Sequence, residues 1–142
     1  MKLLKLVIAS ATVALLANGA AQADAPAREA VMKEIGAAMG GLGRIAKGEV
    51  AYDAAAAEAA KAALIAAAAA VPEAFKEEGP ADAASESKAE IWTNWEDFVK
   101  QADALTAAAT AADVSSAEAI GASMAALGGT CKDCHTAYRV MK

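Results

Sequence analysis

Cys131-Lys132-Asp133-Cys134-His135, close to the C-terminal end of the 142-residue chain, contains both cysteines and the only histidine of the sequence. Residues three and four apart lie on one face of a helix, so the two thiols and the imidazole are expected to point to the same side. The spacing C-x-x-C-H is typical of c-type haem attachment, in which two thiols bond one porphyrin and the imidazole ligates its iron. The sequence therefore predicts one covalently bound haem c per chain, with thioethers at Cys131 and Cys134 and with His135 as the proximal iron ligand.

Three other uses of two cysteines and a histidine fit the sequence less well. A zinc site needs four ligands, and the remaining candidates are carboxylates without a matching spacing. A thioredoxin-like C-x-x-C lies in a βαβ pattern, and the sequence has no credible strand. A disulfide between cysteines three residues apart closes too small a loop to stabilise a fold much. Haem attachment is therefore the preferred interpretation.

The N-terminal segment has the pattern of a secretory signal peptide. Two lysines precede an apolar run over residues 6–17, and Ala21-Gln22-Ala23 is a typical cleavage site. A membrane anchor is the alternative, but the apolar run is too short to span a bilayer comfortably. We therefore expect residues 1–23 to be removed, leaving one domain over 24–142 without a membrane span.

Charge and composition narrow the class of protein. The whole chain has a formal net charge of −5 at pH 7, and the only charged residues of the leader are its two lysines, so the remainder is more acidic still. Basic residues are not clustered, which argues against a nucleic-acid partner. An acidic surface suits an electron carrier that meets a basic patch on a redox protein, although solubility alone explains it equally well. The many alanines and the few β-branched or aromatic residues predict an all-α fold.

The first half of the domain is predicted to contain two helices. The first covers 24–47 and is stopped by Gly48, and the second follows a cap at Asp53 and ends at Pro72. Steps of three and four mark the face of the first helix that is expected to be buried: Met32, Ile35, Met39, Leu42 and Ala46. The second helix is nearly all alanine, so its buried face is poorly specified. Residues 72–86 are expected to form one long loop.

Two more helices are predicted in the second half. They are opened by the capping boxes Ser87-Lys88-Ala89-Glu90 and Ser115-Ser116-Ala117-Glu118. The third helix is expected to bury one face: Ile91, Trp95, Phe98, Ala102, Leu105 and Ala109. The fourth carries the haem motif and is expected to bury Ile120, Met124, Leu127, Cys131, His135 and Tyr138. With one longer connection in the middle, these helices predict an antiparallel four-helix bundle around the haem.

Several stretches of the domain match a known family. They are Arg28-Glu29-Ala30-Val31-Met32 on the first helix, 46–49 with Tyr52-Asp53 at the first turn, 90–92 on the third helix and 128–139 at the end. Through them the chain resembles the class II c-type cytochromes, the cytochrome c prime family, over essentially all of its domain. The position of C-x-x-C-H near the C-terminus separates this class from class I cytochromes c.

The sixth ligand of the iron decides the function that this resemblance implies. Met124 and Met141 share a helix with His135 and are expected on the same side of the haem as that histidine. Met32 and Met39 remain as candidates for the opposite side, seven residues or about 10.5 Å apart on one stripe. Spacing alone does not choose between them.

The family pattern selects Met32, because the distal residue lies four positions after the arginine of the first helix, here Arg28. Low-spin members of the family are similar to this chain in having a methionine ligand there, whereas five-coordinate members have leucine, phenylalanine or tyrosine. The resemblance thus implies a low-spin carrier of single electrons, ligated by His135 and Met32, and not an enzyme. The alternative is that Met32 only packs over an open iron, which implies a high-spin protein that binds nitric oxide or carbon monoxide.

The resemblance also implies where the protein works and with what. Haem is attached to such cytochromes outside the cytoplasm, so together with the leader it places the protein in the periplasm, with redox proteins as partners. Members often form homodimers through their first two helices, and the small residues here allow one. Arg28 and Arg139 are candidates for contacts with the haem propionates, although a solvated position suits each of them as well.

Overall fold

Four long helices and one short helix make up the structure. The computed structural model describes residues 24–78 and 85–140, so the expected signal peptide and Met141 lie outside the described residues. The helices are α1 (Asp24–Ala46), α2 (Ala54–Ala74), α3 (Glu90–Thr93), α4 (Trp95–Ala111) and α5 (Ala117–Tyr138).

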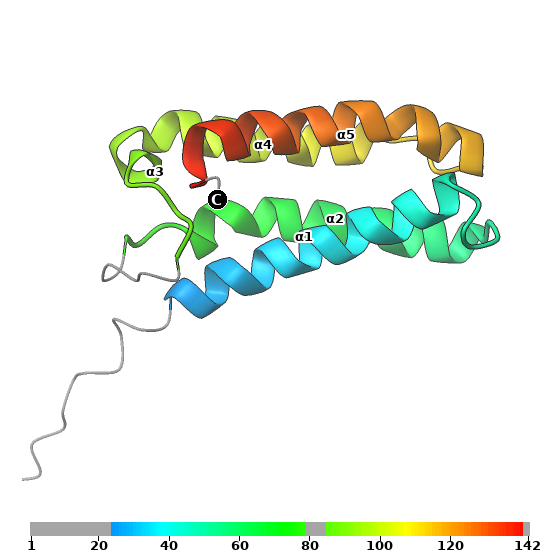
Figure 1. Ribbon diagram of the computed structural model, residues 1–142, viewed down its shortest axis with the longest axis horizontal. Coiled ribbons are helices and arrows are strands. Elements are labelled where there is room, and N and C mark those ends of the chain that lie inside the picture. The colour runs from blue at the N-terminus through cyan, green and yellow to red at the C-terminus, as the bar shows by residue number, and fades with distance from the viewer. Residues whose placement is uncertain (1–23, 79–84, 141–142) are drawn as a thin grey trace, which may run out of the picture.

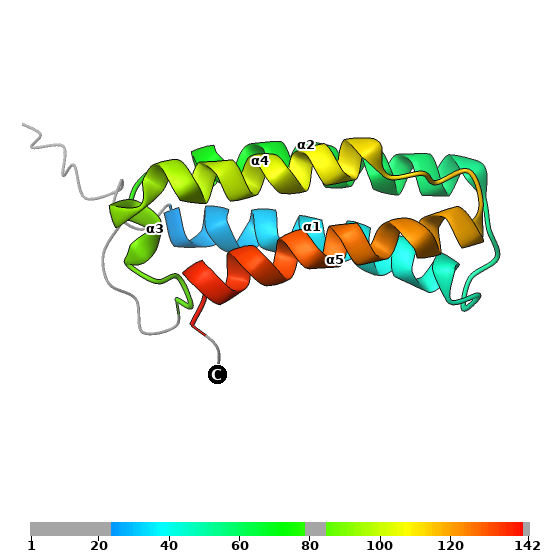
Figure 2. The ribbon, with the colours of Figure 1, turned by 90° about the horizontal axis from the view of Figure 1, so that it is seen from above.

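The four long helices form two layers. In Figure 1, α1 and α2 make the lower layer and α4 and α5 the upper one. Figure 2 shows α4 over α2 and α5 over α1. Contacts join α1 to α2, α2 to α4, α4 to α5 and α5 to α1, and each helix runs opposite to both of its neighbours. The predicted all-α antiparallel four-helix bundle is confirmed.

The turn between α1 and α2 is formed as predicted. Gly48 has a φ of +72°, a conformation that glycine adopts without the steric penalty of a side chain. The amide of Glu49 then donates to the carbonyl of Arg44 (3.0 Å), which closes the end of α1. Asp53 caps α2 by accepting from the amide of Ala56 at 2.7 Å.

α2 continues past Pro72 to Ala74, so the predicted end of this helix at the proline is wrong. Proline removes one backbone donor and crowds the carbonyl four residues earlier, which costs about 3 kcal/mol or more in a helix interior. Val71 and Phe75 are buried on either side of Pro72, and the amide of Phe75 donates to the carbonyl of Val71 at 3.1 Å. Packing of this last turn therefore outweighs the local preference of the proline.

The third predicted helix is divided, and its predicted capping box does not form. α3 begins only at Glu90, and its cap residue, Ala89, makes no side-chain hydrogen bond. Ser87 instead forms an isolated antiparallel bridge with Arg139, so it is not available as a helix cap. Asn94, with φ −122° and ψ 42°, then separates α3 from α4. A contact with a segment 52 positions away thus overrides the local signal.

α5 begins one residue later than its capping box predicts. Ser116, not Ser115, is the cap, and its hydroxyl accepts from the amide of Ala119 at 3.1 Å. The amide of Ser115 donates to the side chain of Asp113 at 2.9 Å, which forms a turn before the helix.

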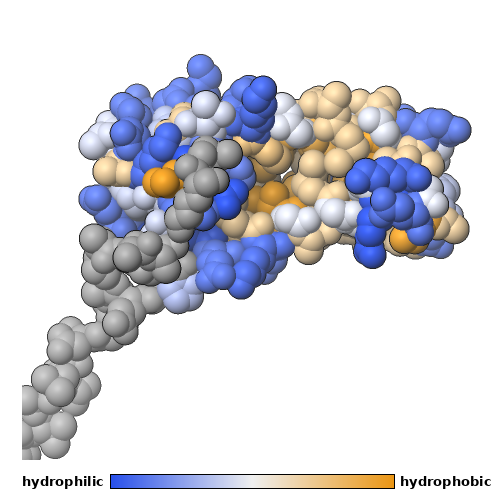
Figure 3. Space-filling model, viewed as in Figure 1, coloured by the Kyte–Doolittle hydropathy of each residue, from blue (hydrophilic) through white to orange (hydrophobic). Residues whose placement is uncertain are grey.

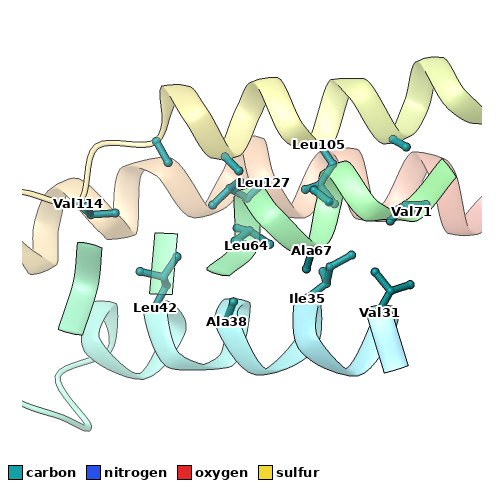
Figure 4. Close-up of a cluster of buried hydrophobic side chains, with 14 of the residues drawn as sticks. Val31, Ile35, Ala38, Leu42, Leu64, Ala67, Val71, Leu105, Val114 and Leu127 are labelled. Atoms are coloured by element: carbon teal, nitrogen blue, oxygen red, sulfur yellow. The ribbon is translucent and has the colours of Figure 1, made fainter. Parts of the chain in front are cut away.

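The core runs the length of the bundle, and on α1 Ile35 and Leu42 are buried as predicted, whereas the other three buried positions lie one residue before the predicted ones. The buried apolar residues of α1 are Val31, Ile35, Ala38, Leu42 and Ile45. Figure 4 shows the first four of these pointing toward the other helices. Met32, Met39 and Ala46 are only partly buried. Neighbouring residues are about 100° apart around a helix, so a shift of one residue places both methionines at the edge of the core.

The predicted faces of the third and fourth helices are largely confirmed. The residues buried as predicted are Ile91, Phe98, Ala102, Leu105, Ala109, Ile120, Leu127 and Tyr138. Trp95, Met124 and Cys131 are partly buried and pack against this core. The positions that carry the haem motif therefore face the interior of the bundle.

α2 is long and apolar enough, by length and composition alone, to cross a membrane. In the structure it is a bundle helix that contacts α1 and α4. Its buried residues are Ala57, Leu64, Ala67, Ala68 and Val71.

Candidate haem site

A cavity of about 850 Å³ lies at the end of the bundle where α1 and α4 begin and α2 and α5 end. Its volume is in the range of roughly 300–1,000 Å³ that is usual for ligand sites. Figure 3 shows a hollow between the two layers, with hydrophobic atoms at its floor and hydrophilic side chains beside it. All six predicted site residues line the cavity: Arg28, Met32, Cys131, Cys134, His135 and Arg139.

The C-x-x-C-H motif forms the α5 wall of this cavity. Both cysteines are free thiols and, like His135, are partly buried. Burial raises the pKa of Cys134 to about 11, with further contributions from Cys131 and Asp97, and burial likewise raises the pKa of Cys131. Burial and the Arg139 guanidinium lower the pKa of His135. At neutral pH the motif therefore presents two protonated thiols and a neutral imidazole, which has a lone pair for a metal.

Met32 on the α1 wall lies at the level of His135. A Cβ added to Gly43 would lie 3.7 Å from the methyl carbon of Met124, which places these two residues side by side on α1 and α5. Both helices rise about 1.5 Å per residue in opposite directions. Met32 and His135 both lie eleven residues from that contact, toward the same end of the bundle, so they come to about the same level, and Met39 lies farther from His135.

The same contact places the other methionines. Met39 also lines the cavity but is four residues from Gly43, so it lies at the level of Gly128. That is about 10.5 Å along α1 from Met32. Met124 packs beside Gly43 and does not line the cavity. Met32 is thus the methionine that the helix register brings opposite His135.

Two glycines leave room between the walls. Gly36 on α1 and Gly128 on α5 both line the cavity, and a Cβ added to either would meet nothing within 4 Å. Gly36 is at the level of Cys131 by the same register, so space is open beside the thiols. Among the described residues, no group of three or more His, Cys, Asp or Glu side chains could hold a metal ion by itself. The cavity therefore fits a large planar group bonded to the thiols, and the zinc alternative gains no support.

Three aromatic side chains line the cavity near the end of the bundle, Phe75, Phe98 and Tyr138. The ring of Phe98 lies 5.3 Å from those of Phe75 and Tyr138 and 5.5 Å from that of Trp95, between ring centroids. The hydroxyl of Tyr138 donates to Asp97 Oδ2 at 2.7 Å, which joins α5 to α4. Burial and this hydrogen bond raise the pKa of Tyr138 to about 12, and the same bond lowers the pKa of Asp97. The aromatic part of the cavity wall is therefore apolar, and the hydrogen bond between Tyr138 and Asp97 fixes the position of one of its rings.

Arg28 is buried, with 5% of its surface exposed, and holds the segment that follows α2. Its Nη1 donates to the carbonyls of Glu77 (3.0 Å) and Glu78 (3.3 Å). The guanidinium carbon lies 5.9 Å from the ring centroid of Phe75 and 5.6 Å from that of Trp92. These are cation–π distances, so the predicted propionate candidate already has protein partners.

Arg139 belongs to a second contact, which we name the terminal bridge and define as residues 86–88 with residues 136–140. Arg139 Nε donates to Glu86 Oε2 at 2.7 Å, and Nη2 lies 2.5 Å from the same oxygen. The amide of Val140 donates to the carbonyl of Glu86 (2.7 Å), and the amide of Lys88 to that of Tyr138 (3.0 Å). The terminal bridge thus ties the end of α5 to the segment before α3.

Sequence reasoning missed the polar partners of these residues. Glu86 and Asp97 are both far in sequence from the residues that they contact, at separations of 53 and 41. Asp97 has one local signal, because Gln101, four residues later, donates to its Oδ2 at 2.8 Å. Glu86 lies in a segment without periodicity, so no pattern in the sequence indicates its role.

The chain is similar to known proteins along nearly its whole domain. The family model described as Cytochrome C′ matches residues 23–139. A cytochrome c-556 of Agrobacterium tumefaciens (strain apple 185) is 43% identical over 119 residues, covering 82% of this chain and 94% of that protein.

Solved structures agree with this similarity. A Rhodobacter cytochrome c′ matches with a TM-score of 0.77 and 30% identity, covering 86% of this chain and 98% of that one. The NMR-validated structure of oxidised R. palustris cytochrome c556 matches with a TM-score of 0.77 and 28% identity, covering 85% and 98%. The chain therefore belongs to the cytochrome c′ family, whose members are non-enzymatic proteins with one covalently bound haem c.

Proposed function

We propose that the protein is a periplasmic monohaem cytochrome that carries single electrons between redox proteins. Cys131 and Cys134 would hold the haem by thioether bonds, and His135 and Met32 would ligate its iron. When bound, the haem supplies a metal centre that accepts and releases one electron.

The observation that carries this proposal is the level arrangement of Met32 and His135 on two walls of one cavity. With Met32 and His135 both as ligands, the iron would have no open position, and a methionine ligand would raise the reduction potential. Met39 reaches a level about two turns further along α1 and remains, as the sequence predicted, a packing residue.

The other residues of the cavity prepare these ligands. The low pKa of His135 keeps its imidazole neutral, and the raised pKa values of Cys131 and Cys134 keep both thiols protonated. Cys131 and Cys134 would hold the haem through thioethers, whose formation from a thiol and a vinyl group needs no net oxidation. The aromatic wall excludes water from the centre, which keeps the local dielectric low.

The relatives support the low-spin interpretation. The similarity includes cytochromes c-556, the low-spin, methionine-ligated branch of the family. Members of the family are typically periplasmic, which agrees with the leader that the sequence predicts.

The test is the visible spectrum of the purified holoprotein, oxidised and reduced, before and after addition of carbon monoxide. We expect a low-spin reduced spectrum with split α and β bands, a weak long-wavelength band of methionine ligation in the oxidised form, and no response to carbon monoxide. Met32→Leu should keep the haem attached and make it bind carbon monoxide, whereas Met39→Leu, the matched control, should behave as wild type.

A broad high-spin spectrum that shifts at once with carbon monoxide would exclude Met32 as the ligand. The function would then be binding of nitric oxide or carbon monoxide at an open iron. If Met39→Leu and not Met32→Leu opened the iron, the register argument would be wrong while electron transfer remained the function.

A further inference from the structure

We propose that Glu86 is a positioning residue for His135, and that its carboxylate, held by Arg139, lowers the reduction potential of the centre. This inference rests on the proposed function, because it assumes a haem ligated by His135. The structure supplies three independent reasons for choosing Glu86.

First, the carboxylate of Glu86 is fixed in place. Its backbone carbonyl accepts from the amide of Val140 and its Oε2 accepts from Arg139, both at 2.7 Å. Ser87, the next residue, pairs with Arg139 in the antiparallel bridge. A charge that is held by main-chain and side-chain contacts acts from one position, which a mobile surface carboxylate does not.

Second, Glu86 lies on the His135 side of the cavity. Among the described residues only two carboxylates line the cavity, Glu29 and Glu86. Glu29 is on α1, its side chain is 66% exposed, and it pairs with Lys33 at 2.6 Å. The side chain of Glu86 is 32% exposed, and its partner Arg139 is one turn after His135 on α5.

Third, a histidine that ligates a metal needs a partner for its other ring nitrogen. Such partners are usually carboxylates, backbone carbonyls or water, and they orient the ring and make it a stronger donor. The backbone carbonyl of His135 is not such a partner, because it already accepts a hydrogen bond from the amide of Arg139. The terminal bridge brings a carboxylate to this end of the cavity without using the helix itself.

The charges of the pair have opposite effects. A negative charge near the centre favours the oxidised, more positive iron and lowers the potential, and a positive charge does the reverse. In the pair the two effects partly cancel. Removing either partner alone leaves the other uncompensated, so the two single variants should shift the potential in opposite directions.

The experiment measures the midpoint potential of the holoprotein by spectroelectrochemistry. Glu86→Gln keeps the shape of the side chain and an acceptor for Arg139, and it should raise the potential. We expect a two- to tenfold change in the equilibrium constant for reduction, tenfold being 59 mV for one electron. Arg139→Gln should lower the potential, and Glu86→Asp, which retains the charge, should restore a value near that of wild type.

Glu29→Gln is the matched control, because it removes the other carboxylate of the cavity. The midpoint potential of Glu29→Gln should shift by less than half as much as that of Glu86→Gln. The proposal is overturned if Glu86→Gln shifts the potential no more than this control. It is also overturned if Glu86→Gln and Arg139→Gln shift it in the same direction, which would indicate loosening of the terminal bridge rather than loss of a charge.

The absorption spectra separate this inference from the proposed function. Variants that keep the wild-type low-spin spectrum without the expected shifts would overturn the role of Glu86 and leave the function intact. A wild-type protein without a His135-ligated haem would overturn both.

Discussion

The two ends of the bundle are built from the same four helices but are packed in different ways. At the end far from the C-terminus, side chains fill the interior, and Leu42, Ala57 and Ile120 are each no more than 1% exposed. At the other end the helices enclose a cavity of about 850 Å³. Three aromatic side chains line that cavity, Phe75, Phe98 and Tyr138, whereas the buried large side chains at the far end are aliphatic, Leu42, Ile45, Val114 and Ile120.

This difference follows from the size of the residues where the helices meet. At the far end a Cβ added to Gly41 would lie 4.0 Å from that of Ala60, and Gly43 accommodates the side chain of Met124. Small residues let backbones approach closely, so few large side chains are needed there. At the cavity end, Phe75 and Phe98 pack together with their ring centroids 5.3 Å apart, and Gly36 and Gly128 leave room between the walls. The two halves therefore differ in where these glycines lie: beside other side chains at the far end, and beside open space at the cavity end.

The largest effect is expected from the thiols, and it should be confined to the cavity end. Cys131→Ser with Cys134→Ser removes both thioether bonds, so we expect no haem to remain on the chain after denaturation. Haem staining of a denaturing gel measures this directly. Haem that stayed covalently attached to the double variant would contradict the assignment of these cysteines.

A substitution that removes a buried side chain at the far end tests whether that half of the bundle is independent of the haem site. Leu42→Ala should lower the free energy of unfolding by about 3 kcal/mol, because the side chain is fully buried among its neighbours. Urea unfolding of the holoprotein measures the loss. The visible spectrum of the folded variant should remain that of wild type, and a change in axial ligation would show that the two ends are coupled.

The hydroxyl of Tyr138 tests the polar contact at the cavity end. Tyr138→Phe removes its hydrogen bond to Asp97 and should cost about 1 to 2 kcal/mol at neutral pH. Because the pKa of Tyr138 is raised to about 12, this contribution is complete below pH 10 and is lost as the pH rises through 12. Because the pKa of Asp97 is lowered, it is also lost as the pH falls below 3.8.

Urea unfolding of wild type and Tyr138→Phe at several pH values measures this window. The difference in the free energy of unfolding between the two proteins should be constant from about pH 5 to pH 9 and should shrink outside that range. A difference that stayed the same at pH 11.5 would show that the hydrogen bond does not cause it.

The smallest effect is expected from the matching hydroxyl at the far end. Tyr52 is 38% exposed, and its hydroxyl donates to the carbonyl of Val114 at 3.0 Å. Tyr52→Phe should therefore cost about 0.5 to 1 kcal/mol, less than Tyr138→Phe, since the acceptor is uncharged and the site is open to water. The same urea experiment measures the free energy of unfolding of both variants. A larger loss for Tyr52→Phe than for Tyr138→Phe would contradict the expected order.

The sequence predicted the parts of this molecule that local rules govern. The bundle, the cap at Asp53, the stop at Gly48 and the buried faces of α4 and α5 follow from periodicity and turn chemistry. The haem itself follows from five consecutive residues. The choice of Met32 over Met39 needed the family pattern and stays a prediction, and Met32 lies on the part of α1 that is nearer to the His135 end of the cavity.

The errors arose where distant contacts override local preference. The turn after Pro72 stays helical because Phe75 packs against Phe98 on another helix. Ser87 pairs with Arg139 instead of capping a helix. Glu86 could not be found at all, because its importance depends entirely on a contact with residues more than 50 positions away.

The contact between α1 and α5 has a consequence for chain entropy. Every other contact between long helices joins consecutive helices, whereas this one joins the first to the last. A bond from Met32 to an iron that is anchored on α5 would cross-link the ends of the domain and close a loop of about 100 residues, for which chain-entropy arguments give about 4 to 5 kcal/mol. The cofactor would then act as a redox-sensitive cross-link between the first and the last helix. Oxidation, ligand exchange or loss of Met32 would change the freedom of the unfolded chain as well as the colour of the protein.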